Sequence, residues 1–95
     1  MQAAYELHIA GLVVRAAPAR VLAVEEAVRL LEGACVHASS PLGKLVVTLE
    51  AFSADEMTSS IGAIQRLPGV LSAALVYQCA DSLDAMNEEV SHAQA

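Results

Sequence analysis

Aromatic residues, positive charges and long apolar runs are all scarce in this chain of 95 residues. Aromatic residues make up 3% and there is no Trp, so any core is small and aliphatic. Five Lys and Arg against eleven Asp and Glu give a net charge of −6. This balance disfavours a nucleic-acid backbone as partner and favours a cationic one, although solubility alone also accounts for it. No apolar run approaches the ~20 residues that cross a membrane.

Catalytic and metal-binding patterns are missing as well. The three histidines are scattered, without the spacing of metal ligands. Cys35 lies two residues from His37, which would suit an activated thiolate, but no third orienting group follows. The glycines form no phosphate-binding loop. We therefore expect a binding protein without cofactor or metal, not an enzyme.

Cysteine usage and the N-terminus bear on where the protein works. Two cysteines far apart in sequence indicate reduced thiols rather than a disulfide framework. Residues 1–6 show neither the basic start nor the cleavage site of a secretory leader. We expect a cytoplasmic protein.

The stretch 8–15, His-Ile-Ala-Gly-Leu-Val-Val-Arg, predicts the strand around which the fold is organised. Side chains alternate along a strand, and here both rows are apolar. Such a strand lies in the middle of a sheet, and both of its apolar faces favour contact with other apolar groups. The fold predicted below leaves one of them without such cover. The two rows are Ala10, Leu12 and Val14 on one side, and Ile9, Gly11 and Val13 on the other.

Two apolar stripes with helical spacing and three more strands follow. The first stripe runs over 18–33 and the second over 53–69, which opens on a capping box formed by Ser53 and Glu56. The further strands alternate with period two. They are residues 34–39, 44–51 and 70–78.

Strand–helix–strand thus occurs twice, which predicts an α+β protein with the ferredoxin-like βαββαβ fold. Right-handed crossovers place both helices on one face of a four-stranded antiparallel sheet, with the first and third strands in the centre. We assign residues 1–79 to this domain. Residues 80–95 are expected to form an acidic, mobile tail, in which Leu83, Met86 and Val90 support at most a frayed helical turn.

The face without helices predicts a binding surface. If the helices cover the row of Leu12, the opposite row forms an apolar strip across three strands. Small residues at Gly11 and Ala74 would leave a trough for a helix or an extended peptide. Burial of this face in a homodimer fits the pattern equally well. The strip consists of Ile9, Gly11, Val13, Val46, Ala74 and Val76, with Arg15, Cys35, His37, Lys44, Thr48, Glu50, Ser72 and Gln78 at its margins. Strict alternation puts Ala73, Leu75 and Tyr77 on the covered face.

Three segments resemble the NapD family, cytoplasmic chaperones of the periplasmic nitrate reductase. They are residues 8–14, 43–51 and 67–77, and the similarity extends over about residues 5–79. The resemblance implies a ferredoxin-like fold. It also implies binding of the twin-arginine signal peptide of the catalytic subunit precursor, which delays export until the molybdenum cofactor is inserted.

The same resemblance implies that the peptide binds to the open sheet face. The expected contacts are Ile9, Gly11, Val13, Val46, Thr48, Ala74 and Val76. Glu50 is a candidate partner for the arginine pair. Arg15 suits a cationic ligand only as a rim residue or as a partner for Glu50.

Other βαββαβ proteins supply alternatives. An ACT-like small-ligand regulatory module would act as a dimer with ligand near Gly33 or Gly69, but no domain to be regulated adjoins it here. A heavy-metal chaperone needs sulfur ligands after the first strand, where residues 16–19 offer none. An acylphosphatase-like enzyme needs an anion cradle near Arg20, which 17–19 do not form. The expected state is a monomer or a weak homodimer.

Overall fold

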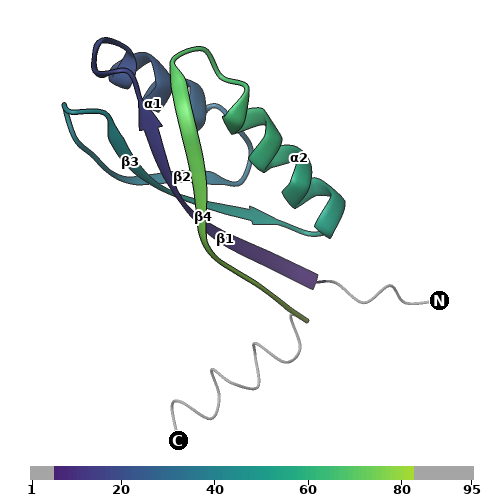
Figure 1. Ribbon diagram of the computed structural model, residues 1–95. Coiled ribbons are helices and arrows are strands. Elements are labelled where there is room, and N and C mark those ends of the chain that lie inside the picture. The colour runs from purple at the N-terminus through teal and green to yellow at the C-terminus, as the bar shows by residue number, and fades with distance from the viewer. Residues whose placement is uncertain (1–5, 83–95) are drawn as a thin grey trace, which may run out of the picture.

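The computed structural model describes residues 6–82 and has the predicted βαββαβ order (Figure 1). A 3₁₀ turn, η1 (Pro18–Arg20), precedes the first helix. The elements are β1 (Glu6–Ala16), α1 (Val21–Arg29), β2 (Ala34–Ser39), β3 (Lys44–Ala51), α2 (Ala54–Gln65) and β4 (Val70–Ser82).

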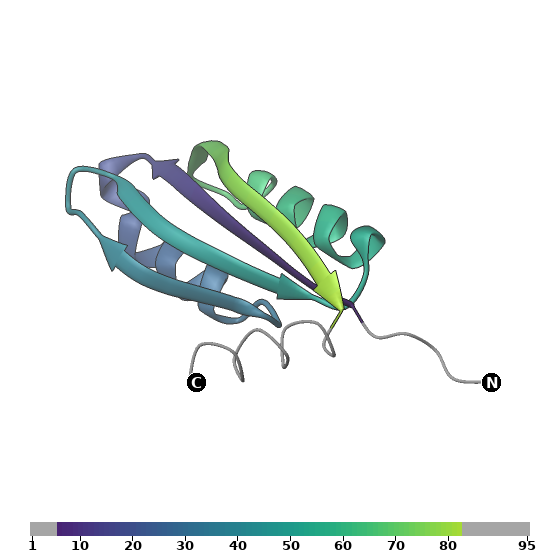
Figure 2. The ribbon, with the colours of Figure 1, turned by 90° about the horizontal axis from the view of Figure 1, so that it is seen from below.

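The four strands form one antiparallel sheet in the order β2-β3-β1-β4, which confirms the ferredoxin-like topology. Both helices lie on the same side of it, so that Figure 2 shows the strands in front and the helices behind. No element within residues 6–82 covers the other side. We call this uncovered side the open face.

The core lies between the sheet and the helices and is aliphatic, as predicted. The even-numbered row of β1 points into it, and every member of that row from Ala10 to Ala16 is nearly inaccessible to solvent. Fully burying one such Leu or Val side chain contributes about 1.5–3 kcal/mol. The other main core residues are Val21, Val24, Val28, Leu45, Val47, Leu49, Ala51, Met57 and Ile64.

The two helices end differently from the sequence-based expectation. Helix α1 stops at Arg29 instead of running to Gly33, and α2 stops at Gln65. Gly33 has a positive φ of 81°, and its carbonyl accepts a hydrogen bond from the Glu50 amide at 2.9 Å. The chain leaves the helix early because this loop packs closely against the backbone of β3.

Helix α1 also contacts β2 through polar side chains. Hydrogen bonds from Arg29, in α1, and Ser39, in β2, lower the pKa of the Glu25 carboxyl.

Helix α2 begins at the predicted capping box. The Glu56 amide donates to Ser53 Oγ at 3.1 Å, and the Glu56 carboxylate accepts from the Phe52 amide at 3.1 Å. Replacing Ser53 with Ala removes one of these partners, and the cost expected for a lost N-cap is about 1 kcal/mol. A lower thermal midpoint for Ser53→Ala, restored by Ser53→Asp, checks this prediction. Equal midpoints for wild type and Ser53→Ala would contradict it.

Strand β4 is longer and less regular than predicted. It continues to Ser82, so residues 80–82, which were expected to begin the tail, belong to this strand. Residues 83–95, for which the sequence allowed a helical turn, lie outside the described residues. Its pairing with β1 shifts between Gly11 and Leu12. Leu12 is opposite Leu75 and Gly11 is opposite Tyr77, which leaves Val76 without a partner. The prediction that Tyr77 shares a face with Leu75 is therefore wrong, because this β-bulge reverses the alternation.

Candidate functional site

The open face consists of parallel rows that run across the sheet. Seven of the eight residues predicted to contact a peptide lie in three of these rows, and the eighth, Val76, is the unpaired residue of the β4 bulge. From strand to strand the rows are Glu50-Ile9-Cys79, then Cys35-Thr48-Gly11-Tyr77, then Ala38-Val46-Val13-Ala74.

Tyr77 lies on this face in the edge strand β4, where the sequence did not place it, and its ring reaches over the central strand β1. A Cβ atom on Gly11 would overlap the Tyr77 ring, so the ring lies directly against the glycine. Gly11 is buried beneath it, while Tyr77 itself is 50% exposed. A glycine inside a strand often marks such a close approach, but only the bulge reveals which side chain approaches.

The side chains around Tyr77 give the open face its apolar character. Val46 and Ala74 are exposed beside the partly buried Ile9 and Val13, and Val76 is 63% exposed. An apolar surface that spans neighbouring strands is typical of a binding site for another molecule.

A second bulge shapes the β2 side of the open face. Val36 pairs with Val47 and Ala38 with Val46, which leaves His37 without a partner. The Nε2 atom of His37 lies 2.7 Å from Oγ1 of Thr48, at hydrogen-bond distance. The bulge also brings Ala38 to the open face, contrary to strict alternation. This polar contact joins the edge strand to the row that contains Gly11 and Tyr77.

Charged residues lie at opposite ends of the open face. Glu50 pairs with Ile9 at one end, whereas Arg15 pairs with Lys44 on one side and Ser72 on the other. From Ile9 to Arg15 the strand advances six residues, or about 20 Å. The sequence analysis allowed Arg15 to be a partner for Glu50, and the structure excludes this pairing. The two residues lie on the same face but are too far apart to form an ion pair.

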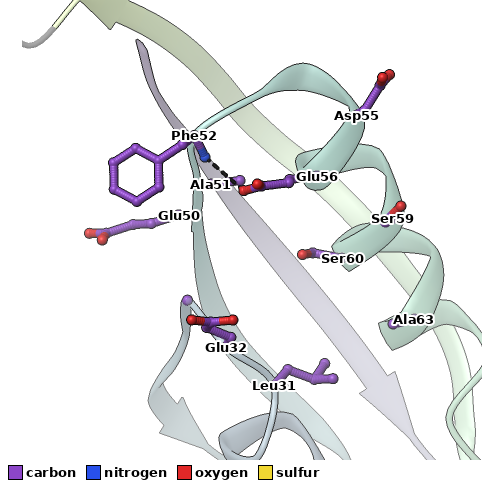
Figure 3. Close-up of a pocket in the computed structure, with 11 residues that line it drawn as sticks. Leu31, Glu32, Glu50, Ala51, Phe52, Asp55, Glu56, Ser59, Ser60 and Ala63 are labelled. Carbon is purple, nitrogen blue, oxygen red and sulfur yellow. Dashed lines mark hydrogen bonds between the residues drawn. The ribbon is translucent and has the colours of Figure 1, made fainter. Parts of the chain in front are cut away.

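An acidic hollow of about 670 Å³ adjoins the Glu50 end (Figure 3). It lies between the start of α2, the end of β3 and the loop after α1. Figure 3 shows the Glu56 carboxylate turned toward the Phe52 amide, as its capping role requires, and Asp55 turned away from the hollow. The acidic residues that line it are Glu32, Glu50, Asp55 and Glu56. They concentrate negative charge at this end of the molecule.

Residues 6–82 contain neither a cluster of metal ligands nor a helix that could span a membrane. No group of three His, Cys, Asp or Glu within residues 6–82 is placed to hold a metal ion. Both cysteines are exposed and unbridged. No helix in this part of the chain has the length and apolarity needed to cross a membrane.

Comparison with known proteins settles the family. A family profile described as "NapD protein" matches residues 7–82, which is most of the chain. The chain belongs to the NapD family. Among solved structures, it is similar to the solution structure of the E. coli Tat proofreading chaperone protein NapD. The two are 29% identical, the alignment covers 75% of this chain and 76% of that one, and the TM-score is 0.71. A comparison with curated proteins found no match.

The matched region coincides with the folded part described above. It begins in β1 and ends at the last residue of β4, so the three rows of the open face and the bulges at Val76 and His37 belong to the NapD region. The resemblance found in three sequence segments is thereby confirmed. The ACT-like, heavy-metal and acylphosphatase-like alternatives share the βαββαβ order, but the family match is to NapD.

Proposed function

We propose that this protein is a cytoplasmic proofreading chaperone. It binds the twin-arginine signal peptide of the precursor of the periplasmic nitrate reductase catalytic subunit, and this delays export until the molybdenum cofactor is inserted. Family membership and the similarity to the E. coli Tat proofreading chaperone support this function and support a protein without enzymatic activity. The observation that carries the proposal is an apolar sheet face that no helix or strand within residues 6–82 covers.

The chemistry of the open face matches that of such a leader. A leader has a basic segment followed by an apolar segment of 7–15 residues. The apolar segment gains from burial against Val13, Val46 and Tyr77, at roughly 25 cal/mol for each Å² removed from water. The basic segment is attracted by a protein of net charge −6, which steers the encounter.

A calorimetric titration of the full chain with the synthetic twin-arginine leader tests this function. We expect saturable binding that weakens when the arginine pair is replaced by two lysines, because Lys cannot form the bidentate contacts of Arg with a carboxylate. A leader of the general secretory type, matched in hydrophobicity, serves as control and binds more weakly. Absence of binding to any leader, together with a stable dimer in light scattering, would instead support the ACT-like regulatory module.

A further inference from the structure

The two ends of the open face carry opposite charges, and the middle is uncharged. Its two middle rows, from Cys35 to Tyr77 and from Ala38 to Ala74, contain no Asp, Glu, Lys or Arg. Glu50 stands at one end, next to the hollow beside the start of α2, whose lining includes Glu32 as well. Arg15 and Lys44 stand at the other end.

The basic end has an arrangement that the fold alone does not explain. Arg15 and Lys44 are directly opposite each other on neighbouring strands, and like charges in that position destabilise a sheet. Both side chains are exposed. The ion pairs found within residues 6–82 join Glu25 to Arg29 and Glu6 to His8, so neither cation has an acidic partner in that part of the chain. As far as residues 6–82 are concerned, the two cations are therefore available to a ligand.

We infer that the open face binds the leader in a single direction. The arginine pair lies at the Glu50 end, and the C-terminal end of the apolar segment lies at the Arg15–Lys44 end. This inference rests on the proposed function and adds two positioning residues to it. The opposite direction would place the arginine pair against Arg15 and Lys44, and such like-charge contacts reject a ligand.

The dimensions and the electrostatics of a helical peptide agree with this direction. At 1.5 Å per residue, an apolar segment of 7–15 residues forms a helix of about 10–22 Å. The distance between the charged ends of the face is about 20 Å. A helix also has a positive N-terminus and a negative C-terminus, which suit Glu50 and the Arg15–Lys44 pair respectively.

Paramagnetic broadening in NMR spectra tests the direction. A nitroxide amino acid is built into the synthetic leader either just before the arginine pair or just after the apolar segment, and each peptide is added to the ¹⁵N-labelled full chain. The first label is expected to broaden the amides of Ile9, Glu50 and Cys79. The second is expected to broaden those of Arg15, Lys44 and Ser72. The reverse pattern, or broadening of both ends by each label, overturns the inference while binding itself stands. Absence of any binding would instead refute the proposed function, and the inference with it.

Charge reversal at Arg15 and Lys44 tests whether these two residues set the direction in which the peptide binds. In a variant with Arg15→Glu and Lys44→Glu, both ends of the face attract the arginine pair, so each label is expected to broaden both ends. The matched control carries Arg20→Glu and Arg66→Glu, which change the net charge equally at exposed sites outside the open face. It is expected to keep the single direction. A single direction retained in the Arg15–Lys44 variant would show that these cations do not position the peptide.

Discussion

Replacing Val13 with Glu is expected to weaken binding of the twin-arginine leader more than tenfold while the protein remains folded. Val13 lies between Val46 and Ala74 in an uncharged row of the open face. A carboxylate there must lose water when the apolar segment of the leader covers it, and a penalty of only about 1.4 kcal/mol is already tenfold in affinity. Because the core lies on the other side of β1, the same change costs little stability. Calorimetric titration measures the affinity, and a circular dichroism melt measures the stability.

Two further variants sharpen this test. Leu22→Glu, at an 80% exposed position on α1, introduces the same charge on the helical side and should leave binding unchanged. Val76→Glu should weaken binding without unfolding the protein, but less than Val13→Glu, since Val76 lies in the bulge outside the paired rows. If Val13→Glu unfolds the protein, our assignment of the two sheet faces is wrong. If it folds and binds normally, the leader binds elsewhere.

Replacing Gly11 with Val is expected to displace the Tyr77 ring from its position over β1 and to destabilise the protein by about 1–3 kcal/mol, the usual cost of overpacking. A Cβ atom at Gly11 has no room while the ring lies against it. When Tyr77 is also replaced with Ala, the conflict disappears. Gly11→Val should then be neutral or stabilising, because Val suits a strand better than Gly.

A double-mutant cycle in denaturant unfolding measures this coupling. The two single variants and the double variant are compared with wild type, and residues in contact are expected to show non-additive effects. Ala63→Val, at a partly buried position on α2 facing the acidic hollow, is a control that should behave independently of Tyr77→Ala. Additive effects of Gly11→Val and Tyr77→Ala would show that the ring does not lie on Gly11.

The parts of this fold that depend on periodic patterns could be predicted from the sequence. The alternation in 8–15 and 44–51 identified the covered row of β1 and β3, and the spacing of Ser53 and Glu56 identified the start of α2. Seven of the eight predicted contact residues therefore share the open face. Each of these features is local or follows from a regular repeat, so no knowledge of distant contacts was needed.

The irregular parts could not be predicted because tertiary contacts decide them. A bulge changes which face every later residue occupies, and the stretch from Leu75 to Tyr77 has no polar residue whose position would reveal the change. For this reason the sequence analysis did not place Tyr77 on the open face. Likewise, Leu30 to Glu32 are good helix formers, yet α1 ends at Arg29 because the loop at Gly33 pairs with Glu50. The register of β1 on β3, which separates Arg15 from Glu50, could not be predicted either, because the alternation within one strand does not determine which residues of two strands are paired.

The most direct test of the open face as the binding surface is a map of amide shift changes when the unlabelled leader is added to the ¹⁵N-labelled full chain. The largest changes should fall on residues of the three rows, among them Ile9, Gly11, Val13, Val46, Thr48, Ala74 and Tyr77. Exposed helical positions such as Leu22 and Thr58 should change little. Changes concentrated on α1 and α2, with the sheet rows unaffected, would contradict the account.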